Sequence, residues 1–267
     1  MAFLDRLDRA WSLSRSNLCV GLDPDPSKMP RRFSSQPNGI ADFCIEIINA
    51  TADLVCAFKP QIAYFAAQRA EDQLETICNY IRSSHPDVVL ILDAKRGDIG
   101  STAANYAIEA YDRFGADAVT VNPYLGTDSV EPFFEAGGGV IGLCRTSNPG
   151  GDDLQMLDTG GEPLFVRVAE MIAQRWSRLG DCGLVVGATY PNELSRVRQI
   201  VGDLPILVPG VGAQGGSADE VKANGSRSDG HGIIVNSSRA VLYASSGDDF
   251  ASAARLVADD TRQSCSP

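Results

Sequence analysis

Eight short apolar runs, rich in β-branched residues, recur along this chain of 267 residues and constrain its fold more than any other feature. They span residues 18–22, 54–58, 88–92, 118–121, 140–143, 184–186, 206–208 and 233–235. The runs do not alternate apolar with polar residues, which is typical of parallel strands that helices cover on both faces. The sequence therefore predicts eight buried parallel strands.

Between most of these runs the apolar residues follow a helical period, at positions i, i+3, i+4 and i+7. The pattern is clearest in three segments, which lie within residues 40–48, 74–81 and 165–179. Thr189 and Pro191 are typical of the start of a further helix over residues 192–201, and Asp219 and Glu220 of another first turn. Eight strand-and-helix units in one chain favour a (β/α)8 TIM barrel over an open doubly wound sheet. Periodicity does not show closure, so the open sheet stays as the alternative.

The connections and ends fit one domain over residues 1–267, since no linker divides the chain. We expect the segment before the first strand to form a helix that plugs the bottom of the barrel. Two polar connections, 23–39 and 147–161, are long enough to be either lids or ordinary surface loops. Residues 263–267 are expected to form a short, flexible C-terminal tail.

Charge and hydropathy exclude several classes of protein. A formal net charge of -11 leaves no positive field for a nucleic acid, so an anionic ligand must be bound locally. No apolar stretch approaches the roughly 18 residues that a membrane span needs. The charged first residues, which include Asp5, Arg6, Asp8 and Arg9, do not resemble a secretory signal. We therefore expect a cytoplasmic protein without a membrane partner.

Metal and thiol chemistry have little support in the sequence. The 7 cysteines are scattered without the close pairs of a zinc site, and they are interpreted as small buried apolar residues. His85 and His231 are the 2 histidines, and neither has a ligand partner at helical spacing. We therefore expect no metal site.

Polar residues follow most of the predicted strands, at the end that carries the active site in a barrel. Asp93 and Lys95 are two residues apart, so both side chains project from the same face of one strand, and Asp98 follows after a turn. Lys59 ends the neighbouring strand. An ammonium group flanked by carboxylates stays protonated. A structural ion pair is the alternative. It is disfavoured because burying a charge directly after the apolar run 88–92 costs free energy, which a purely structural pair gives little reason to accept.

The glycine-rich stretch 209–216 and Arg239 predict a phosphate site. The stretch contains a G-x-G-x-x-G pattern, but it lies at the seventh strand and lacks the acidic strand end that a dinucleotide site requires. Loops after strands seven and eight commonly hold phosphate in barrels. Gln214 would add a side-chain donor and Arg239 a charge. A simple tight turn is the structural alternative.

Taken together, these motifs resemble the orotidine 5'-monophosphate decarboxylase family. Residues 92–102 read L-D-A-K-R-G-D-I-G-S-T and match its D-x-K-x-x-D-I-x-x-T signature. Five further blocks occur in the family's order: G-L-D-P at 21–24, F-K-P at 58–60, T-S-N-P at 146–149, P-G-V-G-A-Q-G-G at 209–216 and N-S-S-R at 236–239. The long loops resemble the bacterial long (type 2) subgroup. The resemblance implies conversion of orotidine 5'-monophosphate to UMP and CO2 in pyrimidine biosynthesis, without a cofactor.

The resemblance also implies catalytic roles. Lys95 would deliver a proton to C6 of the pyrimidine, and Asp93 would lie against the leaving carboxylate. Asp98 and Thr102 would reach across a homodimer interface and complete the neighbouring site, in an array with Lys59.

Other residues would bind the substrate according to the same resemblance. Asp23 and Lys59 would hold the ribose hydroxyls and Ser147 the edge of the pyrimidine, while Gln214 and Arg239 would hold the phosphate. Ser238 replaces a glycine that shorter relatives have before this arginine. No role transfers to Asn122 or Tyr124.

The chemistry of the residues agrees with this function. Loss of CO2 from orotate leaves a carbanion on an sp2 carbon, and a fixed ammonium group stabilises that charge and then protonates the carbon. Three alternatives remain: a metal-dependent sugar-phosphate decarboxylase or epimerase, a Schiff-base aldolase, and a barrel that binds nucleotides without catalysis. The metal-dependent alternative is disfavoured because the two lysines neutralise the carboxylates that a metal would bind. Flanking acids oppose the second, which needs a neutral amine.

Overall fold

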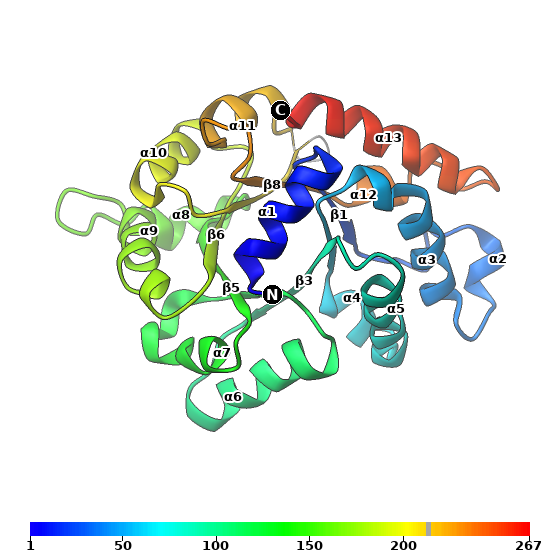
Figure 1. Cartoon of the computed structure of the whole chain (residues 1–267), viewed down its shortest axis with the longest axis horizontal. Coiled ribbons are helices and arrows are strands. Elements are labelled where there is room, and N and C mark those ends of the chain that lie inside the picture. The colour runs from blue at the N-terminus through cyan, green and yellow to red at the C-terminus, as the bar shows by residue number, and fades with distance from the viewer. Residues whose placement is uncertain (212–214) are drawn as a thin grey trace.

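The computed structural model describes residues 1–211 and 215–267, and it contains one closed barrel of parallel strands in sequence order. Figure 1 shows the strands at the centre and the helices around them. The strands are β1 (Leu18–Leu22), β2 (Ala57–Pro60), β3 (Val89–Arg96), β4 (Ala118–Val121), β5 (Gly139–Arg145), β6 (Cys182–Val186), β7 (Ile206–Pro209) and β8 (Ile233–Ser237). The pairing of β1 with β8 closes the sheet and decides for the barrel over the open sheet.

The helices alternate with these strands, as the apolar periodicity predicts. They are α1 (Phe3–Ser14), α2 (Arg31–Ser34), α3 (Gly39–Thr51), α4 (Ile62–Ala66), α5 (Glu71–Ser84), α6 (Gly100–Ile108), α7 (Glu131–Glu135), α8 (Asp152–Gln155), α9 (Leu164–Gln174), α10 (Pro191–Val201), α11 (Ala218–Gly225), α12 (Arg239–Leu242) and α13 (Phe250–Cys265). Pro191 occupies the first turn of α10, although Tyr190 rather than Thr189 precedes it as the N-cap.

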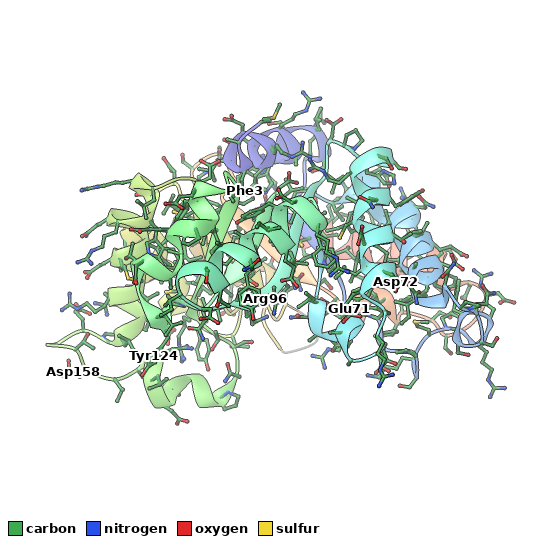
Figure 2. The ribbon with its side chains drawn as sticks, turned by 90° about the horizontal axis from the view of Figure 1, so that it is seen from below. Phe3, Glu71, Asp72, Arg96, Tyr124 and Asp158 are labelled. Carbon is green, nitrogen blue, oxygen red and sulfur yellow. The ribbon has the colours of Figure 1, made fainter. Side chains whose placement is uncertain are left out.

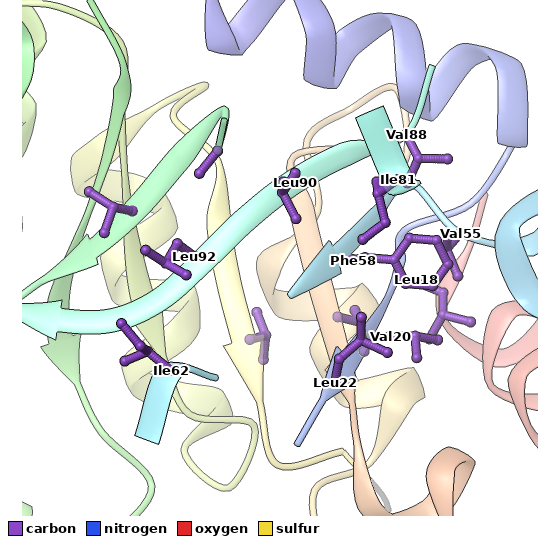
Figure 3. Close-up of a cluster of buried hydrophobic side chains, with 14 of the residues drawn as sticks. Leu18, Val20, Leu22, Val55, Phe58, Ile62, Ile81, Val88, Leu90 and Leu92 are labelled. Carbon is purple, nitrogen blue, oxygen red and sulfur yellow. The ribbon is translucent and has the colours of Figure 1, made fainter. Parts of the chain in front are cut away.

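Strand residues alternate between two apolar layers. Every second residue packs outward against the helices, as Val20, Phe58, Leu90 and Leu92 do (Figure 3). The residues between them point into the barrel and form a second, interior cluster. Burying one large apolar side chain contributes about 1.5–3 kcal/mol, so both layers stabilise the closed sheet. The inward and outward assignment of each strand residue also decides which side chains reach the mouth of the barrel.

Helix α1 closes one end of the barrel, as the sequence predicts. Its buried residues Phe3, Leu7, Ala10 and Trp11 belong to the interior cluster together with the first inward-facing residues of the strands. In Figure 2 this helix and Phe3 lie at one end of the molecule, and Tyr124 and Asp158 lie at the other. The opposite end is therefore the one available for a site.

Several boundaries differ from the sequence prediction. β2 begins at Ala57 rather than at residue 54, because Ala52–Leu54 form a 3₁₀ turn that continues α3. The helix expected through residue 179 ends at Gln174 and continues as a separate 3₁₀ turn, Trp176–Arg178.

The C-terminal end corrects another expectation. Residues 263–265 of the segment expected to be a flexible tail form the end of α13, and Cys265 and Ser266 are buried. The Asn17 side chain donates to the Cys265 carbonyl oxygen at 2.9 Å, which ties this end to the start of β1.

The described residues contain no helix that is long and apolar enough to cross a membrane. All 7 cysteines are free and buried, as the sequence predicts, and burial raises the pKa of the Cys19 thiol to about 12. These thiols stay protonated at neutral pH and serve as apolar packing groups.

Candidate active site

The inward-facing rows of neighbouring strands end in charged groups at the open mouth of the barrel. In β2 the inward row runs from Ala57 to Lys59, and in β3 it runs through Val89 and Ile91 to Asp93. Side chains two residues apart on a strand lie on the same face, so Lys59 and Asp93 point into the barrel like the apolar residues two positions before them. The barrel thus brings together charges that are 34 residues apart in sequence.

Asp93 lies between two ammonium groups. Its Oδ2 accepts a hydrogen bond from Lys59 Nζ at 2.5 Å, and its Oδ1 accepts one from Lys95 Nζ at 2.6 Å. Lys59 and Asp93 are buried, whereas the Lys95 side chain is 47% exposed and stands at the edge of the cluster. The structure therefore assembles three of the four predicted catalytic residues within one chain.

In this cluster, neighbouring opposite charges shift the pKa values of the ionisable groups more strongly than burial does. Burial acts to raise the pKa of Asp93, but the nearby charges of Lys59 and Lys95 hold it well below its usual range. Burial acts to lower the pKa of Lys59, but the charges of Asp93 and Asp23 raise it above its usual range. Both groups are therefore charged at neutral pH.

A cavity of about 440 Å³ opens directly above these charges. Its floor includes Val185 and Leu207, which also belong to the interior apolar cluster. The remaining lining residues are Lys59, Asp93, Lys95, Thr120, Leu143, Thr146, Ser147, Asn148, Gln155 and Pro209. This size falls within the range of about 300–1,000 Å³ that small-molecule sites occupy.

A second, larger cavity of about 670 Å³ lies beside the first, between β5, α9 and the turn at Tyr124. Its walls are mainly apolar, and its described lining carries no carboxylate. The smaller cavity holds the paired charges, so we place the chemistry there.

The loop after β5 carries Ser147 into the smaller cavity and is held by a buried arginine. Arg145 is 2% exposed, pairs with Asp152 at 2.7 Å, and its guanidinium lies 3.7 Å from the centre of the Tyr190 ring. Gln155 accepts a hydrogen bond from the Thr146 backbone nitrogen at 2.9 Å. These contacts set the loop on both sides of Ser147.

Asp23 is close to the same cluster, at the end of β1. Its Oδ1 is buried and has no hydrogen-bond partner among the described residues. The Tyr243 hydroxyl donates to its backbone oxygen at 2.8 Å, which fixes the chain at this point. A buried carboxylate oxygen without a donor is suited to accept a hydrogen bond from a ligand hydroxyl.

The remaining predicted residues lie apart from the cluster within one chain. Asp98 accepts a hydrogen bond from the Ile99 backbone nitrogen at 2.8 Å, and no contact joins it to Lys59, Asp93 or Lys95. Thr102 is exposed at the start of α6. Arg239 is exposed at the first position of α12, directly after β8. Gln214 lies outside the described residues.

Sequence reasoning missed two polar residues of the cavity, Thr120 and Gln155. Thr120 stands inside an apolar strand, where threonine is common for its β-branched shape, and so carries no distinctive signal. Gln155 lies in a long loop whose path the sequence does not define.

A closed (β/α)8 barrel with charged groups at the C-terminal ends of its strands is the architecture of a TIM-barrel enzyme. Residues 16–255 match the model of the orotidine 5'-phosphate decarboxylase / HUMPS family. The chain belongs to this family.

Comparisons with individual proteins agree with the family. The chain is 61% identical to an orotidine 5'-phosphate decarboxylase of Aromatoleum aromaticum and 59% identical to one of Cupriavidus metallidurans, each over 98% of this chain and 97% of the relative. A solved structure of Leishmania donovani OMP decarboxylase superposes with a TM-score of 0.84 at 35% identity, and the match covers 99% of both chains.

Proposed function

We propose that this chain decarboxylates orotidine 5'-monophosphate to UMP and CO2. The observation that carries the proposal is the buried Asp93, held between Lys59 and Lys95 at the base of a cavity whose size is typical of small-molecule sites. Relatives that share more than half of their residues with this chain carry the name of this activity.

In the proposed mechanism, Lys95 stabilises the negative charge that develops at C6 as CO2 departs. An ammonium group that is already oriented before the charge develops stabilises such charge more strongly than solvent does, because no reorganisation is needed. The same group then donates its proton to C6. Asp93 keeps Lys95 in place and lies beside the departing carboxylate, while Lys59 neutralises the other oxygen of Asp93.

The substrate is proposed to lie with its ribose toward Asp23 and Lys59 and its base toward Ser147. The orphaned Oδ1 of Asp23 supports the ribose contact. Arg239, with Gln214, would bind the phosphate at the ends of β7 and β8, and phosphate binding would contribute to rate as well as to affinity. Arg239 is exposed and thus accessible to a ligand.

The site is proposed to be completed in a homodimer by the partner's Asp98 and the partner's Thr102. Asp98 and Thr102 do not reach the cluster of their own chain. Apolar side chains near this edge are exposed, among them Ile99 at 57%, Tyr124 at 78% and Leu154 at 51%. Such residues are typical of a surface that a partner covers.

The activity is tested by incubating the purified protein with orotidine 5'-monophosphate and following the loss of orotate absorbance, with and without excess EDTA. We expect full activity in both. Activity that disappears with EDTA and returns with Mg²⁺ would favour the metal-dependent alternative. Reduction with borohydride in the presence of substrate should leave no covalent adduct, since Lys59 and Lys95 both pair with Asp93.

The phosphate and dimer assignments have separate tests. Arg239→Ala should lower kcat/KM by about 100-fold, because a hydrogen bond to a charged group contributes roughly 1.5–3 kcal/mol, and thermal unfolding should be unchanged. Near-parent activity would refute the phosphate assignment. Mixing inactive Lys95→Met and Asp98→Ala chains should restore activity, because a mixed dimer contains one intact site. Failure to restore activity in verified mixed dimers would refute the shared site.

A further inference from the structure

The strand that carries Lys95 has an irregular backbone at its end. Leu92 pairs with Val119 and Arg96 pairs with Val121, so three residues of β3, 93–95, face the single residue Thr120 of β4. Such a bulge leaves backbone groups without their partners in the ladder and redirects the side chains beside it. Here it lies directly in the candidate active site.

The hydroxyl group of Thr120 replaces the missing ladder partners. Its Oγ1 accepts hydrogen bonds from the backbone nitrogens of Ala94 and Lys95, both at 3.0 Å. The same hydroxyl donates to Asp93 Oδ1 at 3.0 Å. A threonine hydroxyl has one donor and two acceptor sites, so these three bonds use its full capacity. Thr120 is 1% exposed, so water does not substitute for them.

This hydroxyl supports a strained conformation. Lys95 has φ of 48°, in the left-handed region that residues with a Cβ atom rarely adopt. Such strain persists only where the surroundings over-determine the conformation, and it is concentrated at functional sites. The bond from Lys95 N to Thr120 holds the backbone, and the bond from Lys95 Nζ to Asp93 holds the side chain.

We propose that Thr120 is a positioning residue for the decarboxylation. Through one hydroxyl it fixes both the backbone that aims Lys95 and the carboxylate oxygen of Asp93 that the Lys95 ammonium group contacts. This role rests on the proposed function of the chain. Thr120 acts through its neighbours, so its removal lowers the rate of the chemical step and leaves the ribose and phosphate contacts of the substrate in place.

Thr120→Val tests the role, because valine keeps the shape of threonine and removes all three hydrogen bonds. We expect kcat to fall about 10- to 100-fold while the dissociation constant of UMP stays within about threefold of wild type. Thr120→Ser retains the hydroxyl and should stay within about threefold of wild type in kcat. If Thr120→Val is insoluble, Thr120→Ala removes the same hydroxyl, and the same outcomes apply.

Thr51→Val is the matched control. Thr51 is also fully buried, and its hydroxyl donates to the Ile47 carbonyl oxygen within α3 at 2.8 Å, away from the cavity. It should lose stability without a change in kcat at temperatures well below unfolding.

Three results would overturn the role of Thr120. The first is a kcat of Thr120→Val close to that of wild type, and the second is a serine variant as slow as the valine variant. The third is a loss of UMP affinity that parallels the loss of kcat, since this would indicate general collapse of the site. A wild-type protein that leaves orotidine 5'-monophosphate unchanged would instead overturn the proposed function, and the role of Thr120 with it.

Discussion

The two ends of the barrel carry the same charge pattern, a carboxylate between two cations, with one carboxylate in β3 and the other directly before β4. At the mouth, Asp93 lies between Lys59 and Lys95. At the closed end, Asp117 lies between Arg6 at 2.8 Å and Arg82 at 2.7 Å. Each cluster contains one carboxylate and two cations, but only one of them lines a cavity that we identify as the candidate active site.

The type of cation and the access to it distinguish the two clusters. Arg6 and Arg82 come from helices α1 and α5, and Asp117 also accepts a hydrogen bond from the Leu90 backbone nitrogen at 2.8 Å. This cluster fastens the plugging helix to the barrel wall. Arginine does not release its proton in proteins, whereas a lysine ammonium group does. The comparison shows that a charge pattern alone does not define an active site: the cation must be able to give up a proton and must face a cavity.

The largest effect is expected when Lys95 is replaced. Lys95→Met removes both the charge and the proton donor, so kcat/KM should fall by about 10⁴-fold or more. Lys95→Arg places at the mouth the type of cation found at the closed end. Its kcat/KM should still fall roughly 1,000-fold, because arginine keeps the charge but does not release its proton. Steady-state assays of folded protein measure both. An arginine variant within about tenfold of wild type would show that charge alone suffices.

A smaller effect, on stability rather than on rate, is expected at the closed end. Asp117→Asn leaves two arginines without a counter-charge and should lower the free energy of unfolding by about 2–3 kcal/mol. This is less than the loss of a fully buried ion pair would cause, because Arg82 is partly exposed and solvent screens its charge. Chemical denaturation measures this loss, and kcat should remain that of wild type. A large fall in kcat with unchanged stability would contradict the division of roles between the two ends.

The smallest effect concerns pH. The folded pKa of Asp93 lies below its unfolded value near 3.9, so its contribution to stability is complete above that value and is lost as the pH falls below about 4. Lys59 has a raised pKa, so its contribution is complete below about pH 10 and is lost only at higher pH.

The free energy of unfolding should thus receive a constant contribution from this pair between about pH 5 and pH 9. Denaturation at pH 7 and pH 3 should show a smaller acid-induced loss in Asp93→Asn than in wild type. Equal losses in the two proteins would mean that Asp93 is not coupled to the lysines.

Much of the fold and part of the site follow from local patterns. The strands lie where the apolar runs predict them, because a strand covered on both faces needs apolar residues at every position. The two-residue period of a strand predicts that Asp93 and Lys95 share a face, and the two side chains do meet, but through a bulge at residues 93–95 that puts Lys95 in the left-handed region rather than through regular alternation. The shift of β2 to Ala57 was not predicted, since the apolar residues before it serve equally well in a helical turn.

The amino-acid sequence by itself determined the strand-and-helix order, the family, and the charged residues that end the strands, because these depend on short-range periodicity and on motifs. Only the tertiary structure decided that the sheet closes, that Lys59 reaches Asp93, and that Asp98 does not join them within one chain. The tertiary structure also revealed the role of Thr120. A threonine hydroxyl in an apolar strand gives no signal in the sequence, and its role is visible only because a bulge in the neighbouring strand directs two backbone nitrogens at it. Hydrogen bonds between strands depend on register, and register is a property of the closed barrel rather than of any one segment.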